Sequence, residues 1–208
     1  MFINTISKST QKNLDILRDR NVFRDFYLAG GTGAAIQLGH RFSYDLDFFA
    51  DKDFDTGAMK NRFSRISKYF VIKEEKNTLI VDFKNTKISF FSYPYPVLFP
   101  FIVQFGVHIA DIRDIACMKI DTVSSRGAKR DFIDLFFVCK KYRFKIILKL
   151  FKKKYKNINY NLMHILKSLT YFNDAEEEPM PKMLENVSWK EIKGFFVSEV
   201  KKIVEISI

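Results

Sequence analysis

The spacing of apolar residues changes near Ala110 and divides the chain into two halves that fold differently. Before Ala110, short runs alternate apolar and polar residues, which is typical of half-buried strands. After Ala110, apolar residues recur at the helical period. We therefore expect an α+β fold: a mixed sheet with flanking helices over residues 1–110, followed by an all-helical domain over residues 111–208.

The expected elements follow from this periodicity and from the turn residues between them. In the first half, helices are expected over 10–21, 33–38 and 55–68, and strands over 26–29, 45–50, 69–72, 78–83, 87–93 and 103–109. In the second half, helices are expected over 111–124, 129–141, 144–155, 161–171 and 188–205. Gly30 and Gly31 are expected to form a turn, Thr32 to cap the helix that follows, and Gly39 to stop it.

The composition bounds the kind of protein. The 208 residues suffice for one domain or two small ones, and the 23 Phe and 9 Tyr can fill a large core. With only two cysteines, both in helix-like segments, a disulfide framework is not expected, and a cytoplasmic location is. The first residues lack the apolar core of a signal peptide, and the most apolar run, at 97–103, is short and broken by Pro100. No membrane association is expected.

The net charge of +11 favours a polyanionic partner such as nucleic acid. Nine of the seventeen residues from Lys140 to Lys156 are Lys or Arg. Apolar residues recur among them at helical spacing and are expected to face the core, which leaves the charges on an outer face suited to RNA phosphates. The alternative is a lysine-rich composition whose charges form an ordinary solvated surface.

The segment Gly30-Gly31-Thr32 follows an apolar strand and precedes a helix, which is a favourable place for phosphate groups. Glycine lets the backbone approach phosphate oxygens closely. The third small residue of a dinucleotide fingerprint is missing, and so is the Gly-Lys-Ser/Thr of a P-loop. The alternative is an ordinary turn between a strand and a helix.

Asp45 and Asp47 lie two residues apart in an apolar strand and therefore project from the same face. Two adjacent carboxylates near a phosphate cradle are suited to Mg²⁺ and a nucleoside triphosphate. The preceding His40, Arg41 and Ser43 can assist with phosphates. The alternative is the exposed face of an edge strand, or a turn.

In the helical half, Lys119 shares a helix face with apolar residues, where a charge is costly unless it meets an anion. Asp131 and Asp134 lie three residues apart on the next helix. A triphosphate would satisfy Lys119, and so would a structural Lys–Asp ion pair. The turn between these helices holds a basic cluster of Arg126, Lys129 and Arg130.

Two stretches, GGTGAAIQLGHRFSYDLDFF and ADIRDIACMKIDTVSSRGAKRDFIDLFF, resemble the AbiEii/AbiGii toxin family of nucleotidyltransferases, within the DNA polymerase β superfamily. The similarity extends to SYPYP at 92–96 and SLTYFNDAEEEPMP at 168–181. The resemblance implies transfer of a nucleotide from an NTP, in characterised members to tRNA, and control by a separately encoded antitoxin.

The resemblance also implies roles for individual residues. Gly31 and Thr32 would hold the triphosphate, Asp45 and Asp47 would bind Mg²⁺ or Mn²⁺, and Lys119 would contact the nucleotide. The whole expected site comprises Asp45, Asp47, Lys119 and Asp134 as catalytic residues, Gly30, Gly31, Thr32, Arg41 and Lys119 as nucleotide contacts, and Ser43, Arg130 and Asp131 as auxiliary residues.

One position departs from the superfamily pattern. The neighbouring strand commonly carries a third carboxylate, and here that position holds Ser89, with Asp82 as a substitute elsewhere. Asp134 is implied as the base that activates the acceptor hydroxyl, with Asp131 in support. With only two carboxylates at the metal site, three alternatives remain. One metal ion suffices for the reaction, Asp134 contributes to the metal site, or the activity is reduced.

The sequence thus predicts a Mg²⁺-dependent nucleotidyltransferase toxin that acts on an RNA acceptor, a tRNA 3′ end. One alternative is a transferase for a small cationic acceptor such as an aminoglycoside, which would favour an acidic cleft and not a net charge of +11. Others are a catalytically degenerate nucleotide- or RNA-binding module, which the serine at position 89 suggests, and a toxin that acts by sequestration.

Overall fold

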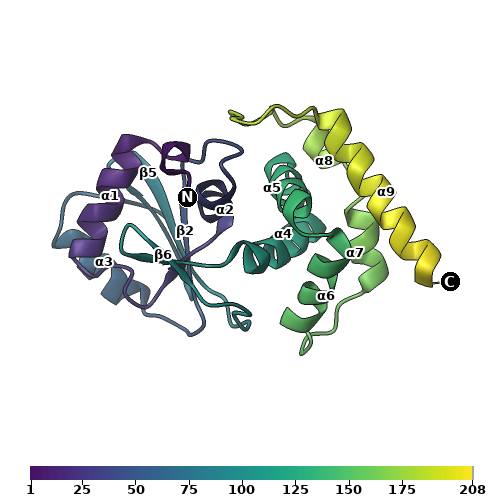
Figure 1. Cartoon of the computed structure of the whole chain (residues 1–208). Helices are drawn as coiled ribbons and strands as arrows, with labels where there is room; N and C mark the ends of the chain where they lie inside the picture. The colour runs from purple at the N-terminus through teal and green to yellow at the C-terminus, as the bar shows by residue number, and fades with distance from the viewer. Residues whose placement is uncertain (208) are drawn as a thin grey trace.

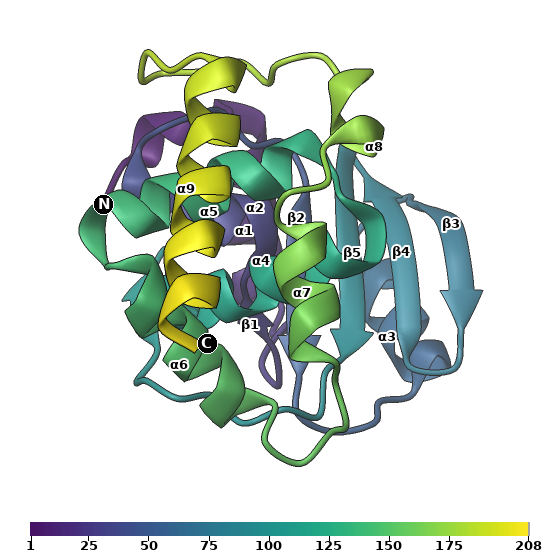
Figure 2. The ribbon, with the colours of Figure 1, turned by 90° about the vertical axis from the view of Figure 1, so that its right-hand side faces the viewer.

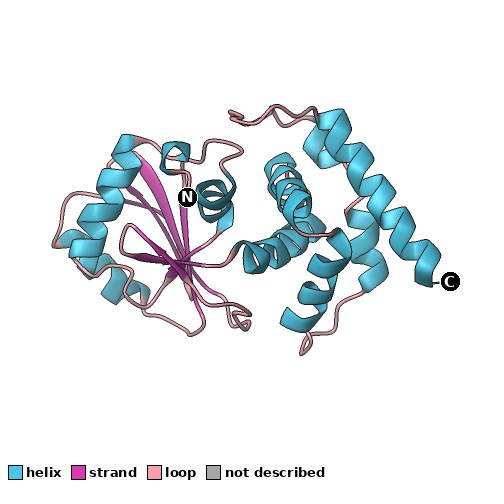
Figure 3. Cartoon of the chain, viewed as in Figure 1, coloured by secondary structure: helices cyan, strands magenta, loops and turns pink. Residues whose placement is uncertain are grey.

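A sheet and a layer of helices lie side by side in this protein (Figure 1). The computed structural model describes residues 1–207. All of the strands in this range belong to the first half of the chain, and the second half consists of helices joined by loops (Figure 3). No helix within this range is long and apolar enough to cross a membrane.

The described elements follow one another along the chain as α1 (Lys8–Asp19), β1 (Tyr27–Leu28), α2 (Gly30–Leu38), β2 (Leu46–Ala50), α3 (Thr56–Ser64), β3 (Phe70–Glu75), β4 (Thr78–Phe83), β5 (Thr86–Ser92), β6 (Ile102–Gln104), β7 (Val107–Ile109), α4 (Ile112–Arg126), α5 (Lys129–Lys141), α6 (Phe144–Lys154), α7 (Leu162–Ser168), α8 (Asn173–Glu176) and α9 (Trp189–Ser207), after a short 3-10 turn at Ile3–Thr5.

The strands form one mixed sheet in the order β3-β4-β5-β2-β1-β7-β6. β2 runs parallel to β5, and their register places Asp47 beside Ser89. β1 runs antiparallel to β2 and parallel to β7. The centre of the sheet is therefore built from β5, β2 and β1, and β2 carries the acid pair into this buried position.

Alternation along β2 separates a core face from a site face. Leu46, Phe48 and Ala50 are buried, and Phe48 stacks on Phe90 of β5 with ring centroids 5.5 Å apart. α1 and α3 cover this face, and their apolar residues join the same core. Asp47 projects from the opposite face, toward α2 and the helical half.

The helical half packs against the sheet through α2. Gly33 of α2 lies so close to α4 that a Cβ atom there would be 2.9 Å from the Ile115 side chain. A continuous apolar cluster runs from Ala34 and Leu38 of α2 through α4 and α5 to Phe196 of α9. α4 and α5 are central, and α9 is the outermost helix (Figure 1).

The sheet extends beyond the helical layer. β3 and β4 lie to one side of the helices (Figure 2). Every residue of β3 is exposed, and its side chains include Phe70, Val71 and Ile72. The site face is thus covered over β1, β2 and β5 and open toward β3.

Three details differ from the sequence-based expectation. The single strand expected over 103–109 is a hairpin, since Phe105 and Gly106 have positive φ and reverse the chain between β6 and β7. Helix α2 begins earlier than expected, so Thr32 lies in its first turn and Ala29 is the N-cap. The strand expected over 69–72 is longer and runs from Phe70 to Glu75 as β3.

One basic residue of the lysine-rich segment is not part of a solvated face. The apolar residues of α6 are buried as expected, but so is Lys154. Its ammonium donates to the Asp114 carboxylate at 2.8 Å and to the Pro96 carbonyl at 2.7 Å. The same carboxylate accepts from the backbone of Leu98 and Phe99. This ion pair ties α4, α6 and the loop after β5 together.

Replacing Lys154 with methionine is expected to lower the free energy of unfolding by about 3–5 kcal/mol, because the Asp114 carboxylate stays buried without its cation. Urea denaturation followed by circular dichroism measures the change. The matched control is Lys153→Met, an exposed position on the same helix, with an expected change within about 0.5 kcal/mol. Equal losses in the two variants would contradict this assignment.

Candidate active site

The acid pair and the glycine turn meet where α2 begins beside β2. Gly30 has a φ of +59°, and a Cβ atom there would lie 2.6 Å from Asp47 Oδ2. Glycine is therefore required at this position both by the backbone conformation and by the carboxylate packed against it. Asp45 precedes the first residue of β2 and is half-buried, as Asp47 is.

The next glycine packs against basic and hydroxyl groups. A Cβ atom at Gly31 would lie 2.6 Å from Arg41 Nη2 and 3.3 Å from Ser43 Oγ. Thr32 is buried, and its hydroxyl donates to the Asp45 carbonyl and lies 2.8 Å from Ser43 Oγ. The structure thus brings these five residues together, and the Thr32 side chain fixes the backbone ahead of β2.

The environment of Asp47 makes its ionisation costly. Burial raises the pKa of this carboxyl above its usual range, and the neighbouring Asp45 charge raises it further. The charge of Lys119 and a hydrogen bond from the Ser89 hydroxyl act in the opposite direction. Two carboxylates that repel each other in a shielded place favour the approach of a cation.

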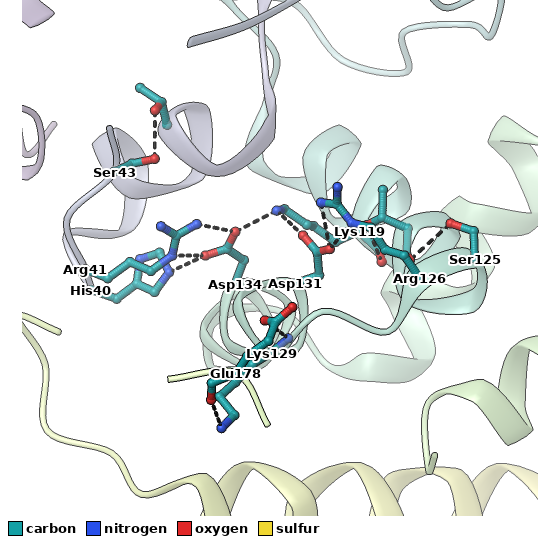
Figure 4. Close-up of polar contacts among 12 residues, drawn as sticks. His40, Arg41, Ser43, Lys119, Ser125, Arg126, Lys129, Asp131, Asp134 and Glu178 are labelled. Carbon is teal, nitrogen blue, oxygen red and sulfur yellow. Dashed lines mark hydrogen bonds and ion pairs between the residues drawn. The ribbon is translucent and has the colours of Figure 1, made fainter. Parts of the chain in front are cut away.

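Asp134 lies at the centre of a buried polar cluster, and Figure 4 shows its partners converging from two parts of the chain. Arg41 Nε donates to Asp134 Oδ1 at 2.7 Å, and Arg41 Nη2 donates to Oδ2 at 2.8 Å. His40 Nε2 lies 2.8 Å from Oδ1, and Lys119 Nζ lies 2.8 Å from Oδ2. Burial opposes ionisation, but the charges of Arg41 and Lys119 outweigh it and hold the pKa of Asp134 well below its usual range.

The cluster continues along α4. Lys119 Nζ donates to Asp131 Oδ1 at 2.6 Å, and Arg126 Nε donates to Asp131 Oδ2 at 2.9 Å. Charges therefore alternate in sign along one row of residues, Arg41, Asp134, Lys119, Asp131 and Arg126, which we call the charge row. An ammonium has three donors, and within residues 1–207 the Lys119 ammonium has protein acceptors for two. The positive charge of this same ammonium lowers the pKa of Asp47.

A segment from near the C-terminus holds the start of the charge row in place. The crossing segment, residues 182–185, runs beside residues 40–42, where Phe42 N donates to the Lys182 carbonyl and Leu184 N to the His40 carbonyl. Arg41 and Met183 form an isolated β-bridge. The crossing segment thus holds the backbone of His40 and Arg41, and Asp134 holds their side chains.

Three further residues singled out in the sequence differ in how they relate to this cluster. Arg130 is exposed on α5 and, within the described chain, joins no ion pair. Asp82 faces the turn after β4 and accepts from the Asn85 backbone at 3.0 Å, with β5 between it and β2. The sequence placed Arg126 only in a basic cluster; in the structure its ion pair with Asp131 makes it the end of the charge row.

The donor set at Asp45 and Asp47 suits one divalent ion that also binds phosphate oxygens. Mg²⁺ is commonly held by one or two carboxylates together with substrate phosphates. Both carboxylates are present, and their mutual repulsion would be relieved by a cation. No group of three or more acidic, His or Cys side chains arranged to hold a metal occurs in the described part of the chain. Asp45 and Asp47 therefore suit a metal site whose remaining ligands come from the substrate phosphates.

Solved structures of two other bacterial proteins share this fold. The nucleotidyltransferase toxin MenT4 of Mycobacterium tuberculosis H37Rv matches with a TM-score of 0.55 and 15% identity, over 91% of this chain and 82% of that one. A Helicobacter pylori protein assigned to the nucleotidyltransferases matches with a TM-score of 0.51 and 18% identity, over 96% and 98% of the two chains.

The sequence shows both the nucleotidyltransferase class and the family. Residues 14–204 match the family described as nucleotidyl transferase AbiEii toxin of type IV toxin–antitoxin systems. The chain therefore belongs to the AbiEii family, which confirms the resemblance seen in the sequence. It is also 39% identical to the uncharacterized protein aq_aa25 of Aquifex aeolicus (strain VF5), over 96% of this chain and 98% of that protein.

Replacing Asp134 with asparagine is expected to lower stability at neutral pH by about 3–5 kcal/mol, because Arg41 and Lys119 lose a buried counter-charge. The folded-state pKa of Asp134 is below the unfolded value of about 3.9, so its contribution is present above that pH and is lost as the pH falls through the folded-state pKa. The difference between wild type and variant is therefore expected to narrow below about pH 4.

Urea midpoints measured from neutral to acid pH test this expectation. The matched control is Asp53→Asn, at a carboxylate whose side chain is 69% exposed, for which no such pH-dependent difference is expected. A stability difference that stays constant across the acid range would show that Asp134 acts through packing alone.

Proposed function

We propose that this AbiEii-family protein transfers a nucleotide from an NTP to an RNA 3′ end with the help of Mg²⁺ or Mn²⁺. The observation that carries the proposal is the packing of Gly30 against the Asp47 carboxylate, which unites a phosphate-binding backbone with a metal-binding acid. On this proposal the acceptor oxygen attacks the α-phosphorus of the NTP, and the bond to pyrophosphate breaks.

The chain's own residues bind and orient the triphosphate. The backbone at Gly30 and Gly31 lies at the N-terminus of α2, where N–H groups favour phosphate. Asp131 and Asp134 accept from two of the three donors of the Lys119 ammonium, so Lys119 would contact a phosphate with the third while these carboxylates hold it in place. A divalent ion on Asp45 and Asp47 would supply charge neutralisation at the reacting phosphoryl group.

For Asp134 we propose a positioning role. A general base works best with a pKa near the working pH, whereas this carboxylate is enclosed by cations and strongly acidic. Its oxygens are engaged by His40, Arg41 and Lys119. Asp134 would thus keep Arg41 and Lys119 aligned at the phosphate site, with Asp131 doing the same for Lys119 and Arg126.

The acceptor is proposed to be RNA, most suitably a tRNA 3′ end, because of the exposed basic surface of the helical half. Eight of the nine basic residues between Lys140 and Lys156 are exposed, and Lys154 is the buried exception. Contacts from such a surface to phosphates are independent of sequence and weaken with salt. A cationic small-molecule acceptor is disfavoured by the same surface. We further propose a cytoplasmic location and an antitoxin partner encoded nearby, as the family implies.

Asp47→Asn is expected to reduce nucleotide transfer at least about 100-fold, because the reacting phosphate loses its main electrostatic support. The assay combines purified protein, total tRNA, a divalent ion and each labelled NTP in turn, and counts label in RNA. Chelation by EDTA is expected to abolish transfer, and added Mg²⁺ or Mn²⁺ to restore it.

Asp82→Asn is the matched control, since this carboxylate lies on β4, two strands from β2, and caps a turn; its transfer rate is expected to stay within about threefold of wild type. Absence of label from folded wild-type protein with every NTP would overturn the proposed activity. It would favour the degenerate binding module that the serine at position 89 suggests.

A further inference from the structure

A hollow opens at the Arg126 end of the charge row, in the helical half. Its volume is about 450 Å³, and it lies between the end of α4 and the segment from α7 to α8. The lining includes Arg126, Lys167, Tyr171 and Asp174. Arg126 also belongs to the charge row, because it donates to Asp131, which accepts from Lys119. The hollow therefore adjoins the end of the charge row.

The chemistry of the lining fits a nucleotide. Tyr171 lines the hollow and is 52% exposed, so its ring is accessible to a ligand. Aromatic faces stack on bases of any sequence. The Lys167 ammonium has no acceptor among the protein groups of residues 1–207 and is free to bind a phosphate. The hydroxyls of Ser124 and Ser125 donate to their own helix, which leaves their oxygens as acceptors.

The position of the hollow favours the acceptor over the incoming NTP. The glycine turn and the acid pair already provide for the triphosphate on the sheet side of Arg126. On the other side, α6, α7 and α8 follow one another up the outer face of the helical half (Figure 2). Exposed lysines at the end of α6 precede Lys167 of α7 along this path. Lys167, the last lysine of this series, lines the hollow itself.

We propose that this hollow binds the 3′-terminal nucleotide of a single-stranded RNA acceptor, with its base on Tyr171 and its phosphate at Lys167. The inference rests on the proposed function, because it names the place of the acceptor at the same site. It adds a recognition site that does not depend on the metal or the triphosphate. The 3′ hydroxyl would then face Arg126 and the acid pair.

The test measures binding without turnover, so that it stands apart from the transfer assay. A short single-stranded oligoribonucleotide with a 5′ fluorophore is titrated with Asp47→Asn protein, and anisotropy gives the Kd. Adding Tyr171→Ala is expected to weaken binding about tenfold, and Tyr171→Phe to keep it within about twofold, because stacking needs the ring and not the hydroxyl. Phe70→Ala, at an exposed ring on β3, is the matched control and is expected to have no effect.

Lys167→Ala provides an independent variant at an exposed position and is expected to lower the slope of log K against log salt by about one. An unchanged Kd for both Tyr171→Ala and Lys167→Ala in folded protein would overturn the proposal, even if wild type transfers nucleotides. Weaker NTP binding by Tyr171→Ala without RNA, with RNA binding unchanged, would also overturn it by assigning the hollow to the incoming nucleotide. Selective loss of RNA binding would support it, even if no transfer is found.

Discussion

The buried contact of Asp134 with Arg41 and Lys119 is the interaction on which the rest of the site depends. Arg41 comes from the loop before β2, Lys119 from α4, and Asp134 from α5. One carboxylate thus joins three segments that are far apart in sequence. Burying these charges is costly unless each is paired, so the segments adopt positions that satisfy all three together. The sheet half and the helical half are held in one relative arrangement by this requirement.

The same arrangement brings opposite kinds of charge to the two sides of the proposed phosphate site. Asp45 and Asp47 lie on the sheet side, and Gly30 leaves room for the carboxylate directly at the start of α2. Lys119 and Arg126 lie on the helical side, and Arg41 joins them from the loop before β2; Asp134 and Asp131 fix all three. Groups held in this way need little reorganisation when substrate charge arrives, which is the condition for effective electrostatic stabilisation.

Much of this could be predicted from local sequence, and the exceptions have a common cause. The alternation in β2, the helical periods of α4 and α5, and the αL residue at Gly39 are local features, and the structure has them where expected. The burial of Lys154 depends on Asp114, forty positions earlier, so helical periodicity placed it on the wrong face. Thr32 was expected to cap its own helix, but its hydroxyl is engaged by the Asp45 carbonyl instead.

The candidate site shows the same division. Spacing placed Lys119 and the acids on the correct helices, but their pairing is set by how α4, α5 and the loop before β2 meet. The sequence left open whether Lys119 meets a triphosphate or an ion pair; the structure has the ion pair and leaves one donor free. No local pattern indicated that residues 182–185 would pair with residues 40–42, because that contact links distant parts of the chain.

The crossing segment has a consequence for the timing of synthesis. A chain emerging from the ribosome folds from its N-terminus, so the sheet, with its acid pair and glycine turn, is complete long before residues 182–185 appear. Until then, the backbone of His40 and Arg41 lacks the partner strand that holds it against Asp134. The charge row therefore gains its full backbone support only after residues 182–185 have been synthesised, long after the acid pair and the glycine turn.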